Sequence, residues 1–320
     1  MSKRTTKSLM GLALLLAALV TLTGCRREPA TPAPRDGKLK VVTTFFPVYC
    51  FTANVAGDLA EVDNLLPPGS GPHGYSFTAR DGQRLSAAQL VIMNGLGLDD
   101  WLSRSIRNLS SKHRPDIVVM SSGMSDQLIE CVHDTHNHDH GHDHSHHHDH
   151  GTHDPHVWLD PILAIEAVNA IREALQQADP ENADGYAANA EAYIARLKAL
   201  DSEIAEDLKN AGEAPFVTFH NAFPYFIRRY GLTLAAVVEQ TPDVSPSPKQ
   251  QKQLYETIRE TKARVLFTEP QFSARLARRI SEDLGIPIAE LDPLETGPFE
   301  RSAYETAMRN NVAVLKERLK

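Results

Sequence analysis

The stretch DPENADGYAANAEAYIARLKALDSEIAEDLKNAG, residues 179–212, lies between two similar halves of the chain and predicts one long helix. Asp179 can cap its N-terminus, Pro180 suits the first helical position, and Gly212 marks its end. Its apolar side chains recur every three or four residues and so share one stripe: Tyr186, Ala190, Tyr193, Leu197, Leu200, Ile204 and Leu208. About thirty residues at about 1.5 Å each make a rod of about 45 Å. We expect residues 179–211 to be a rigid helix that joins two lobes; an ordinary surface helix is the alternative.

Both halves alternate short, apolar, β-branched runs with helical patterns. The expected strands are residues 39–46, 62–66, 90–94 and 116–120 in the first half, and 215–219, 233–238, 265–268 and 286–291 in the second. Strands separated by helices favour right-handed parallel crossovers. The predicted fold is therefore α/β, with two Rossmann-like lobes of parallel strands at residues 39–178 and 212–320. Since open α/β sheets bind ligands beyond the carboxyl ends of their strands, we expect the site in the interlobe cleft.

The N-terminus has the layout of a secretory signal, with a basic start and an apolar core. The residues that end at Cys25 resemble the lipobox of bacterial lipoproteins, so we expect residues 1–25 to be a signal peptide and Cys25 to be lipidated. Residues 26–38 are rich in proline and alanine and predict a flexible tether. These features indicate an exported protein, anchored to a membrane on its periplasmic or extracellular side.

The composition argues against nucleic acid as a partner. The 320 residues include 33 Lys and Arg against 41 Asp and Glu, and no basic cluster stands out. Two cysteines remain besides Cys25, namely Cys50 and Cys131. They could pair in an oxidising compartment, but sequence does not supply the geometry that a disulfide requires, so we leave this question open.

Residues 133–153 read HDTHNHDHGHDHSHHHDHGTH and are too polar to offset the entropy of ordering them. Imidazole nitrogen suits zinc, copper, nickel and iron, and tracts of histidine are typical of metal binding. We expect a mobile loop that binds metal as an auxiliary element. Its candidate ligands are His136, His138, His140, His142, His144, His146, His147, His148 and His150.

Four other metal-capable side chains lie just beyond a predicted strand or just before a predicted helix: His73, His156, His220 and Asp292. Their spacing is not that of a zinc finger, whose ligands come in close pairs. Because they are scattered over the chain, only the fold can bring them together.

Several stretches around these residues resemble the metal-specific solute-binding proteins of bacterial ABC importers, the cluster A-I receptors. They include PPGSGPHGYSFTARD, DPHVWLDP, FHNAFPYFIRRYGL, FTEPQFS and LDPLETG, in this order. The resemblance implies a metal ion between the lobes, held by His73, His156, His220 and Asp292, and delivery to a permease with its ATPase. One departure is Gly71, where the family often has an acidic residue two places before the histidine.

Three imidazoles and one carboxylate suit tetrahedral Zn²⁺, whereas manganese prefers more oxygen ligands. The resemblance agrees, since members of this family that have a histidine at the position of His220 tend to be zinc receptors. Four protein ligands would close the coordination sphere, and no HExxH motif is present, so we expect no enzyme and a supporting role for Glu269. The prediction is a monomeric zinc receptor; a manganese receptor, a surface adhesin and a metallohydrolase are the alternatives.

Overall fold

The computed structural model describes residues 37–107, 114–131, 152–239, 246–271 and 275–320. The predicted signal peptide, Cys25, most of the tether and the nine loop histidines from His136 to His150 lie outside these residues. Within the described ranges, no helix is both long and apolar enough to cross a membrane.

The first lobe is built on a parallel sheet of four strands in the order β2-β1-β3-β4. All four residues of β3 are buried, as expected for an inner strand of a parallel sheet. Helices occupy the crossovers, so the chain alternates strand and helix. The elements are β1 (Leu39–Thr43), α2 (Phe46–Ala56), β2 (Ala60–Asn64), α3 (Ala79–Ala87), β3 (Leu90–Met93), α4 (Asp100–Arg107) and β4 (Asp116–Val119).

The second lobe repeats this arrangement with a parallel sheet in the order β6-β5-β7-β8. Its elements are β5 (Phe216–His220), α7 (Pro224–Tyr230), β6 (Leu234–Glu239), α8 (Pro248–Thr261), β7 (Leu266–Thr268), α9 (Arg275–Leu284), β8 (Ile288–Glu290) and α10 (Ala303–Arg318). Each of the eight predicted strands overlaps an observed one, and the predicted fold of two parallel α/β lobes is confirmed.

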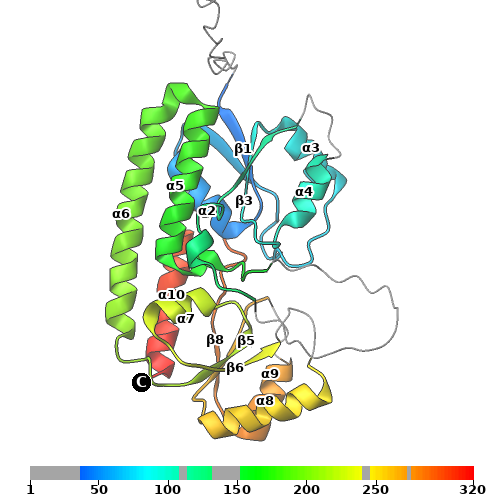
Figure 1. Cartoon of the computed structure of the whole chain (residues 1–320), viewed down its shortest axis with the longest axis vertical. Helices are drawn as coiled ribbons and strands as arrows, with labels where there is room; N and C mark the ends of the chain where they lie inside the picture. Colours follow the sequence, from blue (N-terminus) through cyan, green and yellow to red (C-terminus); the bar gives the residue numbers. More distant parts are fainter. Residues whose placement is uncertain (1–36, 108–113, 132–151, 240–245, 272–274) are drawn as a thin grey trace, which may run out of the picture. The chain divides into compact units, whose positions relative to one another are not determined.

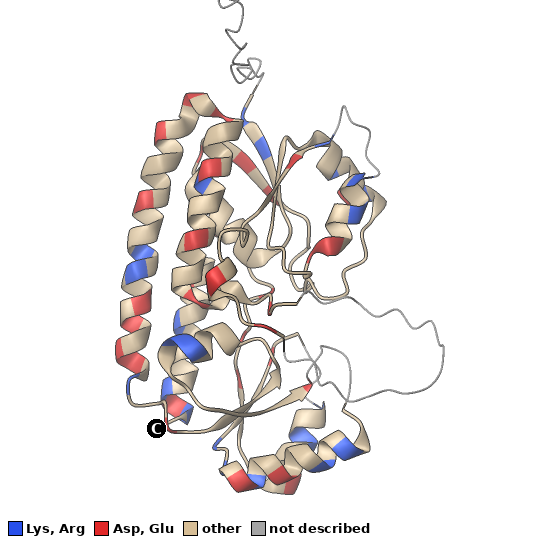
Figure 2. Ribbon diagram, in the orientation of Figure 1, with Lys and Arg blue, Asp and Glu red and all other residues tan. Residues whose placement is uncertain are grey.

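Two long helices, α5 (Pro161–Ala178) and α6 (Ala183–Leu208), connect the two sheets and run side by side (Figure 1). The Asp160 carboxylate caps α5 by accepting the Ile162 N–H at 2.8 Å. The buried face of α6 is the predicted apolar stripe. A 3₁₀ turn, Pro180–Asn182, precedes α6, so its 26 residues span about 39 Å and the helix is shorter than expected. The ribbon in Figure 2 is coloured by residue type and shows acidic and basic residues along α6.

The helix α6 is not a free-standing rod, because it also contacts α2 and α10. One apolar core accordingly includes residues of both lobes. The fully buried Trp158 is part of this core: its ring meets Phe45 edge-on at 5.0 Å, and its Nε1 donates to the Pro293 carbonyl at 2.8 Å. The Tyr304 hydroxyl of α10 donates to the Trp158 carbonyl at 2.7 Å. Packing and hydrogen bonds therefore connect the segment around Trp158 to Pro293 and to α10.

Cys50 and Cys131 are both free, so the possible disulfide between them is not formed. Cys50 is fully buried in α2, where its thiol lies 3.6 Å from the Glu300 carbonyl, and burial raises its pKa. Cys131 lies instead beside the Thr152 backbone, near the base of the histidine-rich segment.

Candidate metal centre

The structure brings three of the four predicted ligands together. His73 lies in the loop after β2, His156 directly precedes a 3₁₀ turn, Val157–Leu159, and His220 is the last residue of β5. A fourth side chain, Glu295, comes from the loop after β8. One ligand atom from each of the four lies within 4.8 Å of every other, and among the described residues this is the one group of its kind.

The ligand atoms have the spacing of a small coordination site. Glu295 Oε1 lies 3.2 Å from His73 Nε2, 3.8 Å from His156 Nε2 and 3.6 Å from His220 Nε2. The Nε2 atoms of His156 and His220 are 3.3 Å apart. A tetrahedral ion about 2.1 Å from each of four ligands would hold those ligands about 3.4 Å apart. The four atoms therefore fit around one ion of the size of zinc with little rearrangement.

Two buried carboxylates orient the histidine rings. His156 Nδ1 lies 2.9 Å from Asp154 Oδ1, and His220 Nδ1 lies 2.6 Å from Glu269 Oε2. Each carboxylate also accepts the backbone N–H of the histidine that it orients. A proton held on Nδ1 leaves the Nε2 lone pair of a neutral ring available for a metal ion. The predicted supporting role of Glu269 agrees with this geometry, because Glu269 faces the far side of the His220 ring.

The centre carries an excess of buried negative charge. Asp154, Glu269 and Glu295 are all less than 5% exposed. Burial favours neutral carboxyl groups, but the three imidazoles outweigh it and lower the pKa of Glu295. Burial would likewise lower the pKa of His156, but Asp154 and Glu295 outweigh it and raise this pKa to about 9. Such a site is stabilised by positive charge, either as a proton on His156 or as a divalent cation.

The prediction of Asp292 as the fourth ligand is corrected by this geometry, because Asp292 is not a member of the group. Its Oδ1 accepts the Leu294 N–H at 2.8 Å, which closes a turn. The Asn311 side chain of α10 holds the Asp292 backbone, accepting its N–H at 2.9 Å and donating to its carbonyl at 2.6 Å. In this turn Leu294 has a positive φ of 57°, and Glu295 follows it. Asp292 thus supports the turn that presents Glu295.

We expect Asp292→Ala to weaken zinc binding about tenfold, the lower end of the 10- to 100-fold loss typical of outer-shell partners. The reason is that the turn would lose its capping carboxylate while Glu295 itself remained. The dissociation constant can be measured by competition with a chelator. Glu290→Ala is the matched control, since Glu290 is exposed at the end of β8. A loss as large as that of Glu295→Ala would identify Asp292 as a direct ligand after all.

Gly71, the departure from the family pattern, lies directly beside the Glu295 carboxylate. A Cβ atom at this position would lie 3.0 Å from Glu295 Oε2, closer than most Cβ contacts in proteins. An acidic side chain there would also bring like charge to Glu295. The small residue at position 71 is therefore compatible with the observed position of Glu295.

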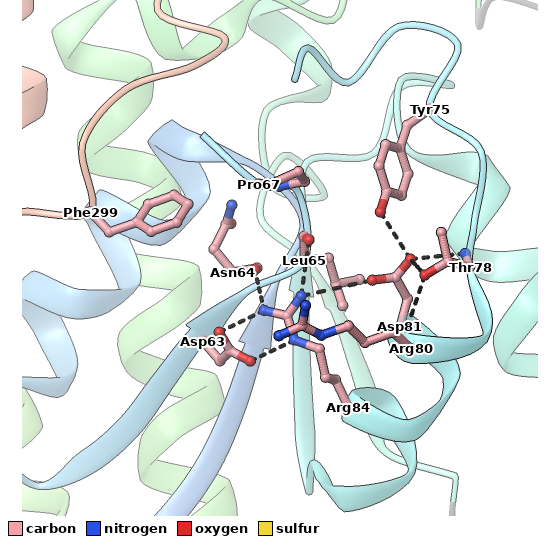
Figure 3. A pocket seen from close by; sticks show the side chains of 10 residues that line it. All are labelled: Asp63, Asn64, Leu65, Pro67, Tyr75, Thr78, Arg80, Asp81, Arg84 and Phe299. Atoms are coloured by element: carbon pink, nitrogen blue, oxygen red, sulfur yellow. Dashed lines mark hydrogen bonds and ion pairs between the residues drawn. The ribbon is translucent and has the colours of Figure 1, made fainter. Parts of the chain in front are cut away.

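A separate pocket of about 330 Å³ lies beside the first sheet, and none of the four ligand residues lines it (Figure 3). Its charged groups largely satisfy one another: Arg84 pairs with Asp63 and donates to the Leu65 carbonyl, and Asp81 accepts from Thr78 and Tyr75. No histidine or cysteine lines it. Its side chains do not form the kind of metal-capable group that the described residues form around His73, His156, His220 and Glu295.

The fold and the largely buried group of three imidazoles and one carboxylate define a two-lobed metal-binding protein. Residues 41–318 match the family described as ZnuA, zinc-uptake complex component A, periplasmic. The chain belongs to this family.

Similar proteins with assigned names support the same placement. The zinc-binding lipoprotein AdcA of Streptococcus pneumoniae is 33% identical over 96% of this chain, which spans 60% of the length of that relative. The manganese ABC transporter substrate-binding lipoprotein PsaA of the same species is 31% identical over 96% of this chain and 97% of its own length. The crystal structure of Zn(II)-bound AdcA has a TM-score of 0.71 and 32% identity, covering 88% of this chain and 58% of that one.

Proposed function

We propose that this chain is an extracytoplasmic zinc receptor, which binds Zn²⁺ and delivers it to a membrane permease with its cytoplasmic ATPase. The observation that carries the proposal is the convergence of His73, His156, His220 and Glu295, with atomic separations close to those around a tetrahedral zinc ion. Family membership and the zinc-binding relatives support the same substrate.

The ligand chemistry favours zinc over manganese. Three imidazoles and one carboxylate match the usual ligands of zinc, whereas manganese prefers more oxygen. A site of nitrogen and oxygen ligands also binds zinc more tightly than manganese in the general affinity series of divalent metals. The manganese-transporter relative keeps manganese as the alternative substrate to be tested.

We assign the chain a receptor function and not a catalytic one. Four protein ligands complete a tetrahedral sphere, while a catalytic zinc keeps a position open for water. Glu269, the carboxylate that could be considered as a general base, is engaged with His220 Nδ1. In this proposal the protein acts as a monomer, anchored outside the cytoplasm by a lipid on Cys25.

The histidines of residues 136–150 have an auxiliary role in this proposal. They bind zinc weakly and raise its local concentration near the high-affinity site, which is an effect of effective concentration. Sensing of excess zinc, with slower delivery, is the alternative role for this segment. Thr152, which follows the segment, is only four positions before His156, so either role acts close to the site.

The test is a metal competition on purified protein that has been stripped of metal, carried out with and without residues 134–151. We expect one tightly bound zinc ion per chain in both forms, with manganese bound at least about a hundredfold more weakly. Elemental measurement after dialysis gives the stoichiometry, and chelator competition gives the affinities. A shortened protein that prefers manganese, or that has no tight zinc site, would refute the proposal.

A further inference from the structure

Two short segments of the first lobe pair with each other directly upstream of His156. Glu130 and His153 form an antiparallel bridge, the Cys131 N–H donates to the Thr152 carbonyl at 2.9 Å, and the Asp154 N–H donates to the Ile129 carbonyl at 2.8 Å. We call these segments, residues 129–131 and 152–154, the stem. The stem ends two residues before His156.

A single hydroxyl group of the second lobe binds both segments of the stem. Tyr225, in the first turn of α7, is fully buried. Its hydroxyl donates to the Asp154 carbonyl at 2.8 Å and accepts the Ile129 N–H at 3.1 Å. Burial raises the pKa of Tyr225 to about 12, so the hydroxyl keeps the proton that it donates. Tyr225 therefore joins the two segments to each other and to α7.

Arg228, one turn further along α7, supports the same contact. Its guanidinium lies 5.2 Å from the centre of the Tyr225 ring, and it donates to the Gln127 carbonyl at 2.8 Å. Two side chains of α7 thus bind backbone carbonyls of residues 127 and 154 in the first lobe. This contact fixes the place of the stem against the second lobe.

Asp154 links Tyr225 to the metal centre, because the same residue also bonds to the ligand His156. The backbone carbonyl of Asp154 accepts from the Tyr225 hydroxyl, and the Asp154 side chain holds both the backbone N–H and Nδ1 of His156. The helix α7 begins four residues after His220. Tyr225 therefore connects the element that follows one ligand with the residue that orients another, and the Nε2 atoms of these two ligands are 3.3 Å apart.

We infer that Tyr225 is a positioning residue for the zinc site. Through its bond to the Asp154 carbonyl it keeps the His156 ring in place beside His220. The inference rests on the proposed zinc-binding function. Without the hydroxyl, the Asp154 carbonyl and the Ile129 N–H lose a buried partner. The stem then becomes more mobile, and so does the His156 ring that Asp154 orients.

The test compares Tyr225→Phe with Tyr230→Phe, each loaded with one equivalent of metal so that the tightest site fills first. The control removes a hydroxyl from the same helix, because Tyr230 bonds to Asp201 and not to the stem. We expect Tyr225→Phe to raise the zinc dissociation rate about three- to tenfold, somewhat less than loss of a direct outer-shell partner. We also expect it to change the visible spectrum of bound Co²⁺, which reports ligand geometry. Tyr230→Phe should leave both properties as in the wild type.

Amide hydrogen exchange separates a positioning role from a purely structural one. In Tyr225→Phe the Ile129 amide should exchange faster, together with the changes at the metal. Faster exchange with an unchanged zinc dissociation rate and Co²⁺ spectrum would overturn the inference, and so would a Tyr225→Phe protein identical to the wild type in all three measurements. If the wild-type protein had no tight zinc site, the proposed function itself would fail, and that outcome is visible before any variant is made.

Discussion

His220→Ala is expected to lower zinc affinity by more than about a hundredfold, since loss of an outer-shell partner alone typically costs 10- to 100-fold. His220 supplies one of four ligand atoms, is 1% exposed, and is already oriented by Glu269. Its removal leaves two imidazoles and Glu295 as the remaining ligands of the group. Isothermal titration or chelator competition would measure the loss.

Two comparisons give this experiment its meaning. His153→Ala is the matched control, because His153 lies in the stem, is hydrogen bonded to Thr152 and is not a member of the metal group. Deletion of residues 134–151 should reduce the number of weakly bound ions but change the tight site far less than His220→Ala does. Comparable losses from the deletion and from His220→Ala would show that the tight site is not the one described.

Zinc binding should release about one proton per ion at pH 7 to 8. Zinc requires the free lone pair of His156 Nε2, while Asp154 and Glu295 raise the pKa of this imidazole to about 9 in the metal-free protein. Below pH 9 zinc must therefore displace a proton, so the apparent affinity should fall about tenfold for each unit by which the pH falls. The ordinary pKa of histidine, about 6.5, would place this loss of affinity at considerably lower pH.

Titration calorimetry in two buffers with different heats of ionisation measures the released proton directly. The observed heat should differ between the buffers at pH 7.5, and the difference should shrink above pH 9. A heat that did not depend on the buffer would contradict the prediction. The same raised pKa makes the metal-free protein less stable at high pH. Protonated His156 contributes fully to the free energy of unfolding below about pH 6.5, and this contribution is lost as the pH rises through about 9.

The periodicity of the sequence predicted the fold because the fold depends on patterns that are repeated many times. Alternating strands and helices required two parallel sheets, and the apolar stripe from Tyr186 to Leu208 is the buried face of α6. The boundaries of α6 were less well predicted, since a 3₁₀ turn replaces its expected first turn. The packing of α6 against α5, α2 and α10 depends on contacts that no single segment encodes.

The fourth ligand could not be chosen from the sequence because it depends on the course of one turn. LDPLETG offers two carboxylates, and Asp292 is the one directly after the strand. Which carboxylate reaches the histidines depends on the positive φ of Leu294 and on the two hydrogen bonds between the Asn311 side chain and the Asp292 backbone, and Asn311 is distant in sequence. An aspartate that can accept the N–H two residues later is a common sign of a turn, but the prediction of Asp292 as the ligand did not use this sign.

The role inferred for Tyr225 had no signal in the sequence. The sequence around His220 contains several aromatic residues, but nothing in it marks one hydroxyl as the partner of two backbone groups 71 and 96 positions earlier. Hydrogen bonds to backbone atoms do not require a particular partner residue, so they leave no pattern of paired residue types.

The apolar core that is common to both sheets bears on how the chain folds. Residues of α2, α6 and α10 contribute to it, and Trp158 and Tyr304 bond across it. A chain that stopped after α6 would expose the surfaces that α10 and the second sheet cover, so neither half should be an autonomous folding unit. We therefore expect the described part of residues 35–320 to unfold as one cooperative unit, and neither lobe to be complete before the last helix, α10, has been synthesised.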